Sequence, residues 1–148
     1  MSAVQSNSDQ YRAQSIDVLA RTIYGEARGE PVRGKEAVAA VVVNRVRRAR
    51  LRNGYWWGHD IKSVCQKPWQ FSCWNEDDLN LEKITTVTAA NSVFKTCLRV
   101  ARRALAGTLK DPTGGATHYH ALGIEPPWAR SQEPSATIGR HKFYANIE

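Results

Sequence analysis

The sequence predicts a mainly helical α+β domain with a small β or irregular portion near its end. Three segments repeat apolar residues at a spacing of three to four, which is typical of helices packed on a core. After Asp111 this spacing gives way to short aromatic runs broken by Pro and Gly, which favour strands and loops. A length of 148 residues with 42% apolar residues fits one ordinary domain.

The first helix is expected to begin at Ser15, because serine is a frequent N-cap residue. Apolar residues follow on one stripe as far as Ala27, and then Gly29 and Pro31 interrupt the pattern. We therefore expect residues 1–14 to form a flexible N-terminal arm and residues 15–148 to form the folded domain.

The second helix is expected to start near Gly34–Glu36 and to run through AVAAVVVNRVRRAR, with its first half buried. Residues 53–78 hold four of the five Trp together with Pro and Gly, so we expect a structured loop with short pieces of helix or strand. A third helix follows over Val87–Leu105, ended by Gly107. Residues 116–121 and 142–145 are expected to be strands or loops.

The net charge of +7 favours polyanionic partners, such as nucleic acid, an anionic cell wall or an acidic lipid surface. Five arginines lie in Arg45–Arg52, but they spread around a helix and no nucleic-acid-binding motif accompanies them. We therefore expect diffuse attraction to an anionic surface and no nucleic-acid partner. The longest apolar run, Ala37–Val43, is far shorter than the ~20 residues of a membrane span.

The three cysteines are Cys65, Cys73 and Cys97, an odd number at spacings that match no zinc ribbon or thioredoxin motif. We expect small buried apolar residues, with a disulfide and a free thiol as the alternatives.

The most informative segment is YGEARGE, which places Glu26 and Glu30 four residues apart at the end of the first helix. Gly25 is unfavourable inside a helix by ~1 kcal/mol, so we expect another segment to approach the backbone closely there. A helix C-terminus and loss of solvation both favour the protonated form of a carboxyl group. Such a group can act as a general acid on a glycosidic oxygen. Solvated glutamates paired with nearby arginines are the alternative.

Two further clusters contain candidate site residues. PWQFSCWN interleaves aromatic rings with Gln, Ser and Asn, as in a carbohydrate cleft, although a core loop with buried Trp has the same composition. In ATHYHA, His118 and His120 would point to one side of a strand. With His141 they would supply a three-His zinc site, as in an N-acetylmuramoyl-L-alanine amidase, but the sequence has no HExxH motif.

Taken in order, four motifs resemble those of the SleB-type cell wall hydrolases, the spore-cortex-lytic and phage-lysin group. They are LARTIYGEARGEPVRGKEAVAAVVVNRV, KPWQFSCWN, GATHYHA, and PPWA followed by IGRHKFY, and together they span about Ser15 to Tyr144. The resemblance implies that residues 15–148 are a catalytic domain of lysozyme-like, lytic-transglycosylase-like fold that acts on peptidoglycan.

The resemblance also implies site residues. Glu26 matches the catalytic glutamate of the family, whereas Gln70, Phe71, Tyr119, His120 and Glu30 are expected at the substrate, Glu30 chiefly as structural support. The reaction would cleave the bond between N-acetylmuramic acid and N-acetylglucosamine with one carboxyl group, without a cofactor or metal. A zinc amidase using His118, His120 and His141, and a non-catalytic basic module binding the wall or nucleic acid, are the alternatives.

The first residues, Met1–Gln10, lack the basic start and apolar segment of a secretory signal. The sequence also shows no separate wall-binding module. These features favour a monomeric phage-type endolysin that stays in the host cytoplasm until it reaches the cell wall or periplasm, or a virion-associated enzyme.

Overall fold

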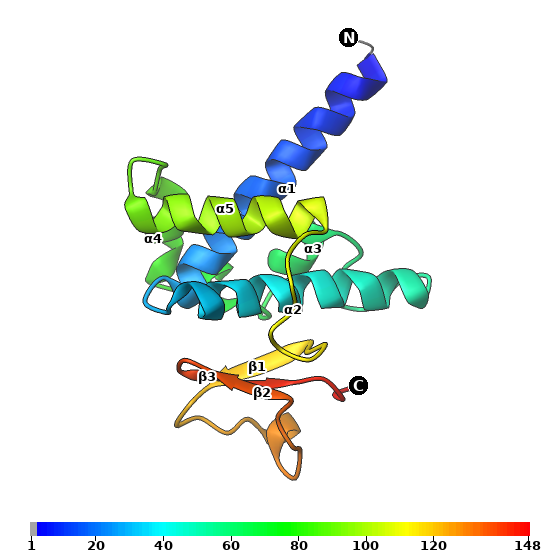
Figure 1. Cartoon of the computed structure of the whole chain (residues 1–148), viewed down its shortest axis with the longest axis vertical. Helices are drawn as coiled ribbons and strands as arrows, with labels where there is room; N and C mark the ends of the chain where they lie inside the picture. The colour runs from blue at the N-terminus through cyan, green and yellow to red at the C-terminus, as the bar shows by residue number, and fades with distance from the viewer. Residues whose placement is uncertain (1–2) are drawn as a thin grey trace.

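The computed structural model describes residues 3–148, which form a layer of helices above a small sheet (Figure 1). The bounds of the helices are α1 Ala3–Ala27, α2 Val32–Leu51, α3 Ile61–Cys65, α4 Asn80–Thr86 and α5 Ser92–Ala106, with 3-10 turns η1 Ser72–Trp74 and η2 Pro127–Ala129. The strands are β1 His118–Ala121, β2 Ala136–Ile138 and β3 His141–Tyr144.

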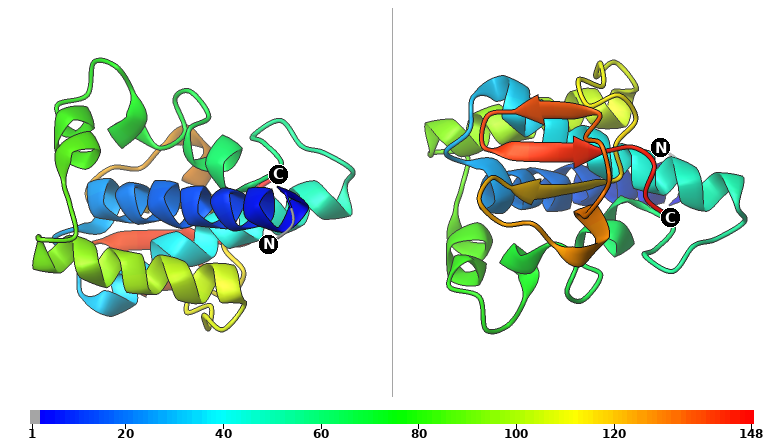
Figure 2. Two further views of the ribbon diagram at one scale, coloured as in Figure 1. Left: turned by 90° about the horizontal axis from the view of Figure 1, so that it is seen from above. Right: turned by 90° about the horizontal axis from the view of Figure 1, so that it is seen from below.

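Helix α1 is the centre of the helical layer, since α2, α3, α4, α5 and η1 all pack against it. Its apolar stripe is fully buried at Leu19, Ala20 and Ile23, as the spacing of these residues predicts. The first half of α2 is buried on nearly all sides because α5 packs against it as well and the sheet lies on its other side (Figures 1 and 2). No helix among the described residues is long and apolar enough to cross a membrane.

The predicted start of the first helix is wrong. Helix α1 begins at Ala3 rather than at Ser15, and Ser15 lies in its interior with 2% of its surface exposed. Residues 7–14 are exposed, and the Tyr11 hydroxyl donates to Asp60 Oδ2 over 2.8 Å. The segment contains no Pro or Gly, so nothing in it interrupts the helix.

The third helix also begins later than predicted. The side chain of Asn91 accepts hydrogen bonds from the backbone of Val93 and Phe94, so it is the N-cap of α5. Val87 instead ends α4, a short helix that the sequence analysis missed. Gly107 ends α5 with a left-handed φ of 75°, as predicted.

The sheet is antiparallel in the order β1-β3-β2, with Tyr119 opposite Phe143 and Ala121 opposite His141. Strand β2 was not expected, since its three residues are too few for an alternating pattern. The sheet lies below α2 (Figure 1), and Ala116, Ile138 and Phe143 belong to the main hydrophobic core that the helices also form.

All three cysteines are buried and unpaired, which confirms the prediction of small buried apolar residues. Burial raises the pKa of Cys65 to about 12 and that of Cys97 to about 11, so both thiols stay neutral.

Gly25 has the close neighbour that its position predicted. A Cβ atom there would lie 2.6 Å from Cys73 Cβ and 2.9 Å from Ile84 Cγ2, so η1 and α4 can approach α1 only at a glycine. Although Ala normally stabilises a helix, we expect Gly25→Ala to lower the free energy of unfolding by about 1–3 kcal/mol through overpacking. Urea denaturation measures this. Gly29→Ala is the control, because no atom lies within 4 Å of its Cβ position, and equal stability of the two variants would contradict the packing argument.

Candidate active site

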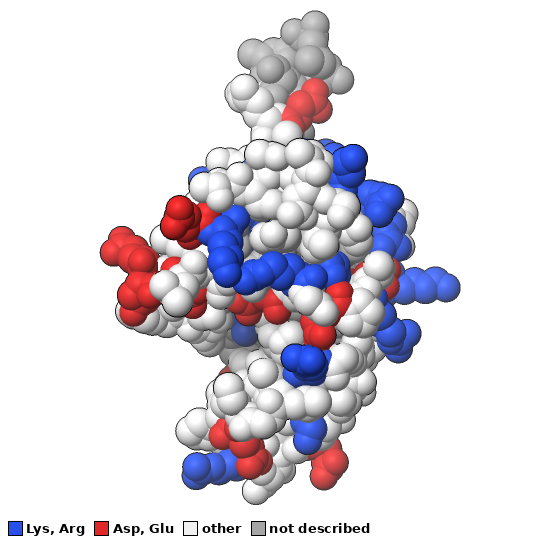
Figure 3. Space-filling model, turned by 90° about the vertical axis from the view of Figure 1, so that its left-hand side faces the viewer, with Lys and Arg blue, Asp and Glu red and all other residues white. Residues whose placement is uncertain are grey.

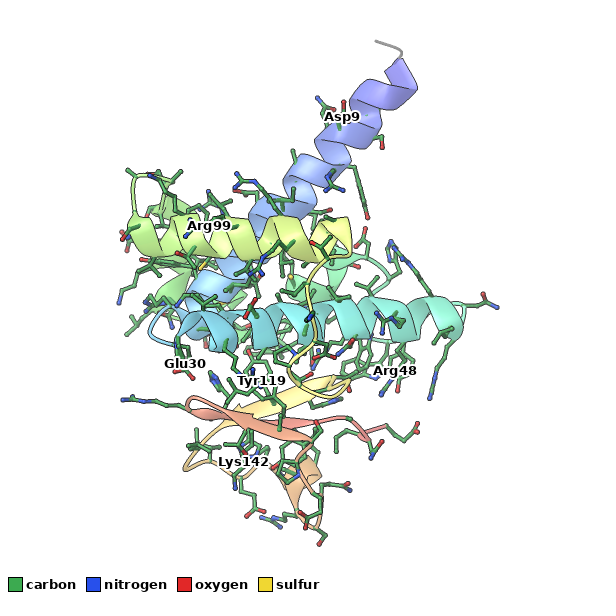
Figure 4. The ribbon with its side chains drawn as sticks, viewed as in Figure 1. Asp9, Glu30, Arg48, Arg99, Tyr119 and Lys142 are labelled. Carbon is green, nitrogen blue, oxygen red and sulfur yellow. The ribbon has the colours of Figure 1, made fainter. Side chains whose placement is uncertain are left out.

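A cleft of about 550 Å³ lies where the end of α1, the loop before η1 and strand β1 meet. Tyr119 lies between the sheet and the helices above it (Figure 4). The side chains that line this cleft are mostly aromatic and polar, and include Glu26, Arg45, Trp56, Trp69, Gln70, Phe71, His118, Tyr119, His120, Trp128, His141 and Glu148.

Glu26 is presented to the cleft by the last turn of α1. Its Oε1 atom accepts a hydrogen bond from the Tyr119 hydroxyl over 2.5 Å. The bond joins residues 93 positions apart in the sequence, so it depends on the docking of β1 beneath the helices. It occupies one carboxyl oxygen and leaves Oε2 as the atom that can carry a proton toward a substrate.

Tyr119 is held as a neutral hydrogen-bond donor. Burial raises its pKa well above the ordinary value, and the nearby charge of Glu26 raises it further. Its ring packs against Phe143 at 5.5 Å, Phe71 at 6.4 Å and His141 at 5.0 Å between ring centroids. The hydroxyl therefore has a fixed position from which to orient the carboxyl group.

Arg45 forms part of the cleft although only 6% of it is exposed. Its guanidinium lies over the rings of Trp57 and Phe71, donates from Nε to Thr117 O over 2.8 Å and from Nη1 to Gln70 Oε1 over 3.2 Å. Burial lowers its pKa to about 10, so it stays charged at neutral pH. It joins α2 to both the loop and β1.

Glu30 does not line the cleft. Its Oε1 accepts from the backbone N–H of Arg140 over 2.7 Å and lies 3.2 Å from His141 Nδ1. A Cβ atom at Gly139 would lie 2.6 Å from the same oxygen, and Gly139 has a left-handed φ of 55°, so a larger residue would displace the Glu30 carboxylate and strain the β2–β3 turn. Figure 4 shows Glu30 at the end of α2 nearest that turn. The contacts of Glu30 are thus with the β2–β3 turn and His141, and not with the cleft.

The three histidines of the alternative zinc site do not converge. The strand register puts His141 opposite Ala121, on the other face of the sheet from His118 and His120. His120 is bonded to Tyr144 Oη over 2.8 Å, and His118 to Thr117 Oγ1 over 2.9 Å. Within residues 3–148, no three His, Cys, Asp or Glu side chains are grouped so that they could hold a metal ion.

His118 gives the fold a pH dependence. Burial, and then the charges of Arg45 and Arg48, lower its pKa from 6.5 to about 4. The unfolded chain therefore binds a proton between these values while the folded protein does not, so the stabilisation is complete above pH 6.5 and is lost as the pH falls toward 4. We expect the melting temperature of His118→Gln to fall less between pH 7 and pH 4.5 than that of the parent. Parallel melting curves across this range would contradict the assignment.

The other predicted site residues differ in how much of each side chain is exposed to the cleft. Gln70 and His120 line it with polar groups. Phe71 is 2% exposed, so it supports Tyr119 and Arg45 from below and offers little surface to a ligand. Phe71 is among the residues that line the cleft, but the sequence motif gave no sign that its ring would be almost fully buried.

Several residues of the cleft were missed, above all Trp56, Trp69 and Trp128. Trp69 is 74% exposed and has a left-handed φ of 68°, which for so bulky a residue costs about 1–3 kcal/mol. The density of Trp in this region was a signal for the cleft, but no sequence pattern indicated which rings are exposed.

The arginine run is only partly the solvated surface that the sequence predicted. Arg45 is buried, Arg48 donates to Ile147 O over 2.8 Å, and Arg52 lies over the Tyr55 ring and 3.6 Å from Glu148. Three of the five arginines thus fasten loops and the last residues to α2. Elsewhere, Lys and Arg gather in a band across the face shown in Figure 3.

The comparisons with known proteins agree with this geometry. Residues 29–144 match the Cell Wall Hydrolase family, and the chain belongs to that family. The spore cortex-lytic enzyme of Halalkalibacterium halodurans is 32% identical over 136 residues, which cover 90% of this chain and 35% of that protein. The Bacillus cereus spore cortex-lytic enzyme is 29% identical over 90% of this chain and 45% of its own length. The chain thus spans less than half of these relatives.

Two solved structures share the fold. The catalytic domain of the Bacillus cereus SleB protein has a TM-score of 0.67 and 28% sequence identity, with 88% of each chain covered. The catalytic domain of the germination-specific lytic transglycosylase SleB from Bacillus anthracis has a TM-score of 0.66 and 28% identity, over 88% of this chain and 93% of that one. The predicted fold, mainly helical with a small β portion and similar to SleB-type enzymes, is confirmed.

Proposed function

We propose that this chain is a peptidoglycan lytic transglycosylase in which Glu26 is the single catalytic acid and base. The observation that carries the proposal is the Glu26 carboxyl group, held by Tyr119 in a cleft rich in aromatic and polar side chains. Family membership and the likeness to a germination-specific lytic transglycosylase support the same reaction.

The cleft favours a mechanism with one carboxyl group. Among its described lining residues the other carboxylate is Glu148, which is exposed and pairs with Arg52. A glycosidase that uses the two-carboxylate mechanism of hydrolysis needs a second carboxylate about 5–9.5 Å from the first, placed across the scissile bond. A transglycosylase does not, because the sugar supplies its own nucleophile.

In the first step, Glu26 donates its proton to the oxygen that bridges N-acetylmuramic acid and N-acetylglucosamine, and the C1–O bond breaks. The N-acetyl group of the muramic acid stabilises the positive charge that develops at C1. Tyr119 stabilises the carboxylate left on Glu26, because its hydroxyl already donates to Oε1.

In the second step, the C6 hydroxyl of the same muramic acid attacks C1 and gives its proton to the Glu26 carboxylate. A 1,6-anhydro ring closes, no water is consumed, and Glu26 is protonated again for the next cycle. Gln70 and His120 would bond to hydroxyl and acetamido groups of the strand, whereas Glu30 would act only through the β2–β3 turn.

Purified peptidoglycan provides the first test. We expect the chain to release soluble fragments at a rate that EDTA leaves unchanged, because the histidines of the alternative site lie on opposite faces of the sheet. The rate is followed as loss of turbidity with and without the chelator. Inhibition that added Zn²⁺ reverses would contradict the proposal and favour the amidase.

The cell wall is accordingly the proposed place of action. The relatives named above are spore cortex-lytic enzymes, which gives the phage-endolysin expectation no support, so it is not part of the proposal. Exposed Lys and Arg would attract anionic wall polymers in a salt-dependent way.

A further inference from the structure

A second cavity of about 400 Å³ adjoins the catalytic cleft at Trp69, whose side chain lines both. Its other walls come from the same loop region and are formed by Gln66, Pro68, Trp74, Asn75 and the two carboxylates Glu76 and Asp77. None of these six residues lines the catalytic cleft. Trp69 is therefore the lining residue that the two cavities share.

The exposure and the backbone conformation of Trp69 indicate that its ring binds a ligand. The ring is largely exposed and makes no aromatic pair or cation–π contact with any residue of the described chain. Its backbone nevertheless keeps a left-handed φ, a conformation that glycine would adopt without strain. A strained position that presents a bare aromatic ring to solvent is typical of a binding residue.

The walls of the second cavity offer both apolar ring faces and polar side chains to a ligand. Trp74 is fixed, because its Nε1 donates to the buried Thr22 Oγ1 over 2.9 Å. Asn75 Oδ1 accepts from the Trp69 backbone N–H over 3.3 Å, which supports the Trp69 turn. The indole rings offer apolar faces, and the amide of Gln66 can both donate and accept hydrogen bonds.

We propose that this cavity is an additional saccharide subsite, in which the glycan strand continues from the catalytic cleft past the Trp69 ring. This inference rests on the proposed function for the identity of the strand. A pyranose has an apolar C–H face that fits an indole ring and hydroxyl and acetamido groups that fit the Gln66 amide. The proposal predicts that long strands bind more tightly than strands that fill the catalytic cleft alone.

Binding is measured in a Glu26→Gln background, so that no strand is cleaved. The ligands are stem-free glycan strands of two lengths, one disaccharide unit and four units, and the readout is tryptophan fluorescence or calorimetry. We expect Trp69→Gly and Gln66→Ala each to weaken binding of the long strand, the former by about tenfold. Gln66→Ala should leave the short ligand unaffected, because Gln66 lines only the second cavity.

Trp69→Gly also separates binding from folding, since glycine relieves the left-handed φ and should raise the melting temperature while it weakens binding. Leu51→Ala, at an exposed position outside both cavities, is the control. Unchanged binding of the long strand to Gln66→Ala would overturn the proposal, as would an equal loss of binding for the short and the long strand. Tight length-dependent binding without cleavage by the parent would instead contradict the proposed function and leave the subsite standing.

Discussion

Glu26→Gln is expected to lower the rate of peptidoglycan cleavage by about a thousandfold or more, because general acid–base catalysis contributes about 10²–10⁴ and this carboxyl group serves in both steps. Glutamine keeps the shape of the side chain and can still accept the Tyr119 hydrogen bond through its carbonyl oxygen. It cannot deliver or take up the proton. The measurement is the initial rate of fragment release from purified peptidoglycan, with the melting temperature recorded beside it.

Glu36→Gln is the matched control for this variant. Glu36 lies on α2 outside the cleft and pairs with Arg103 over 2.8 Å, so loss of its charge should leave the rate within about twofold of the parent. A purified, folded Glu26→Gln protein that solubilises peptidoglycan at the parental rate would contradict the catalytic assignment of Glu26.

Tyr119→Phe is expected to lower kcat by about tenfold to a hundredfold while KM changes little. The variant removes the hydroxyl that fixes Oε1 of Glu26, and small misplacements of a catalytic group can cost about 10² in rate. The fold should persist, because phenylalanine keeps the ring contacts with Phe71 and Phe143. Steady-state kinetics on soluble glycan strands separate kcat from KM.

Tyr11→Phe tests whether this effect belongs to the cleft. Tyr11 also donates its hydroxyl to a carboxylate, that of Asp60, but it lies about four turns of α1 before Glu26 and does not line the cleft. The control should keep the parental kcat. Equal activity of Tyr119→Phe and the parent would show that Glu26 needs no orienting donor.

The helical part of the fold was largely predictable, because apolar spacing reports directly on a buried helix face. The stripe through Leu19 and Ile23 and the stop at Gly107 are as predicted. The errors concern the first residues of helices, because a residue that can cap a helix can also lie inside one. Ser15 has the chemistry of a cap but lies inside α1, whereas Asn91 is a cap that the apolar period of α5 concealed.

The candidate site was predictable only in part. Motif order brought Glu26, Gln70 and Tyr119 to one cleft, although they come from a helix, a loop and a strand. The burial of Arg45 could not be foreseen, since a charged residue in an arginine run gives no sign that two aromatic rings and Thr117 O enclose it. The left-handed φ of Trp69 could not be predicted either, because this conformation is usual for glycine and rare for a tryptophan.

Mass spectrometry of the soluble fragments released from purified peptidoglycan tests the central claim most directly. If Glu26 acts alone as acid and then base, the muramic ends are 1,6-anhydro sugars, each lighter by one water than the corresponding reducing end. Reducing muramic ends would contradict the single-carboxyl mechanism and require a held water with a second base, and free stem peptides would contradict glycan cleavage itself.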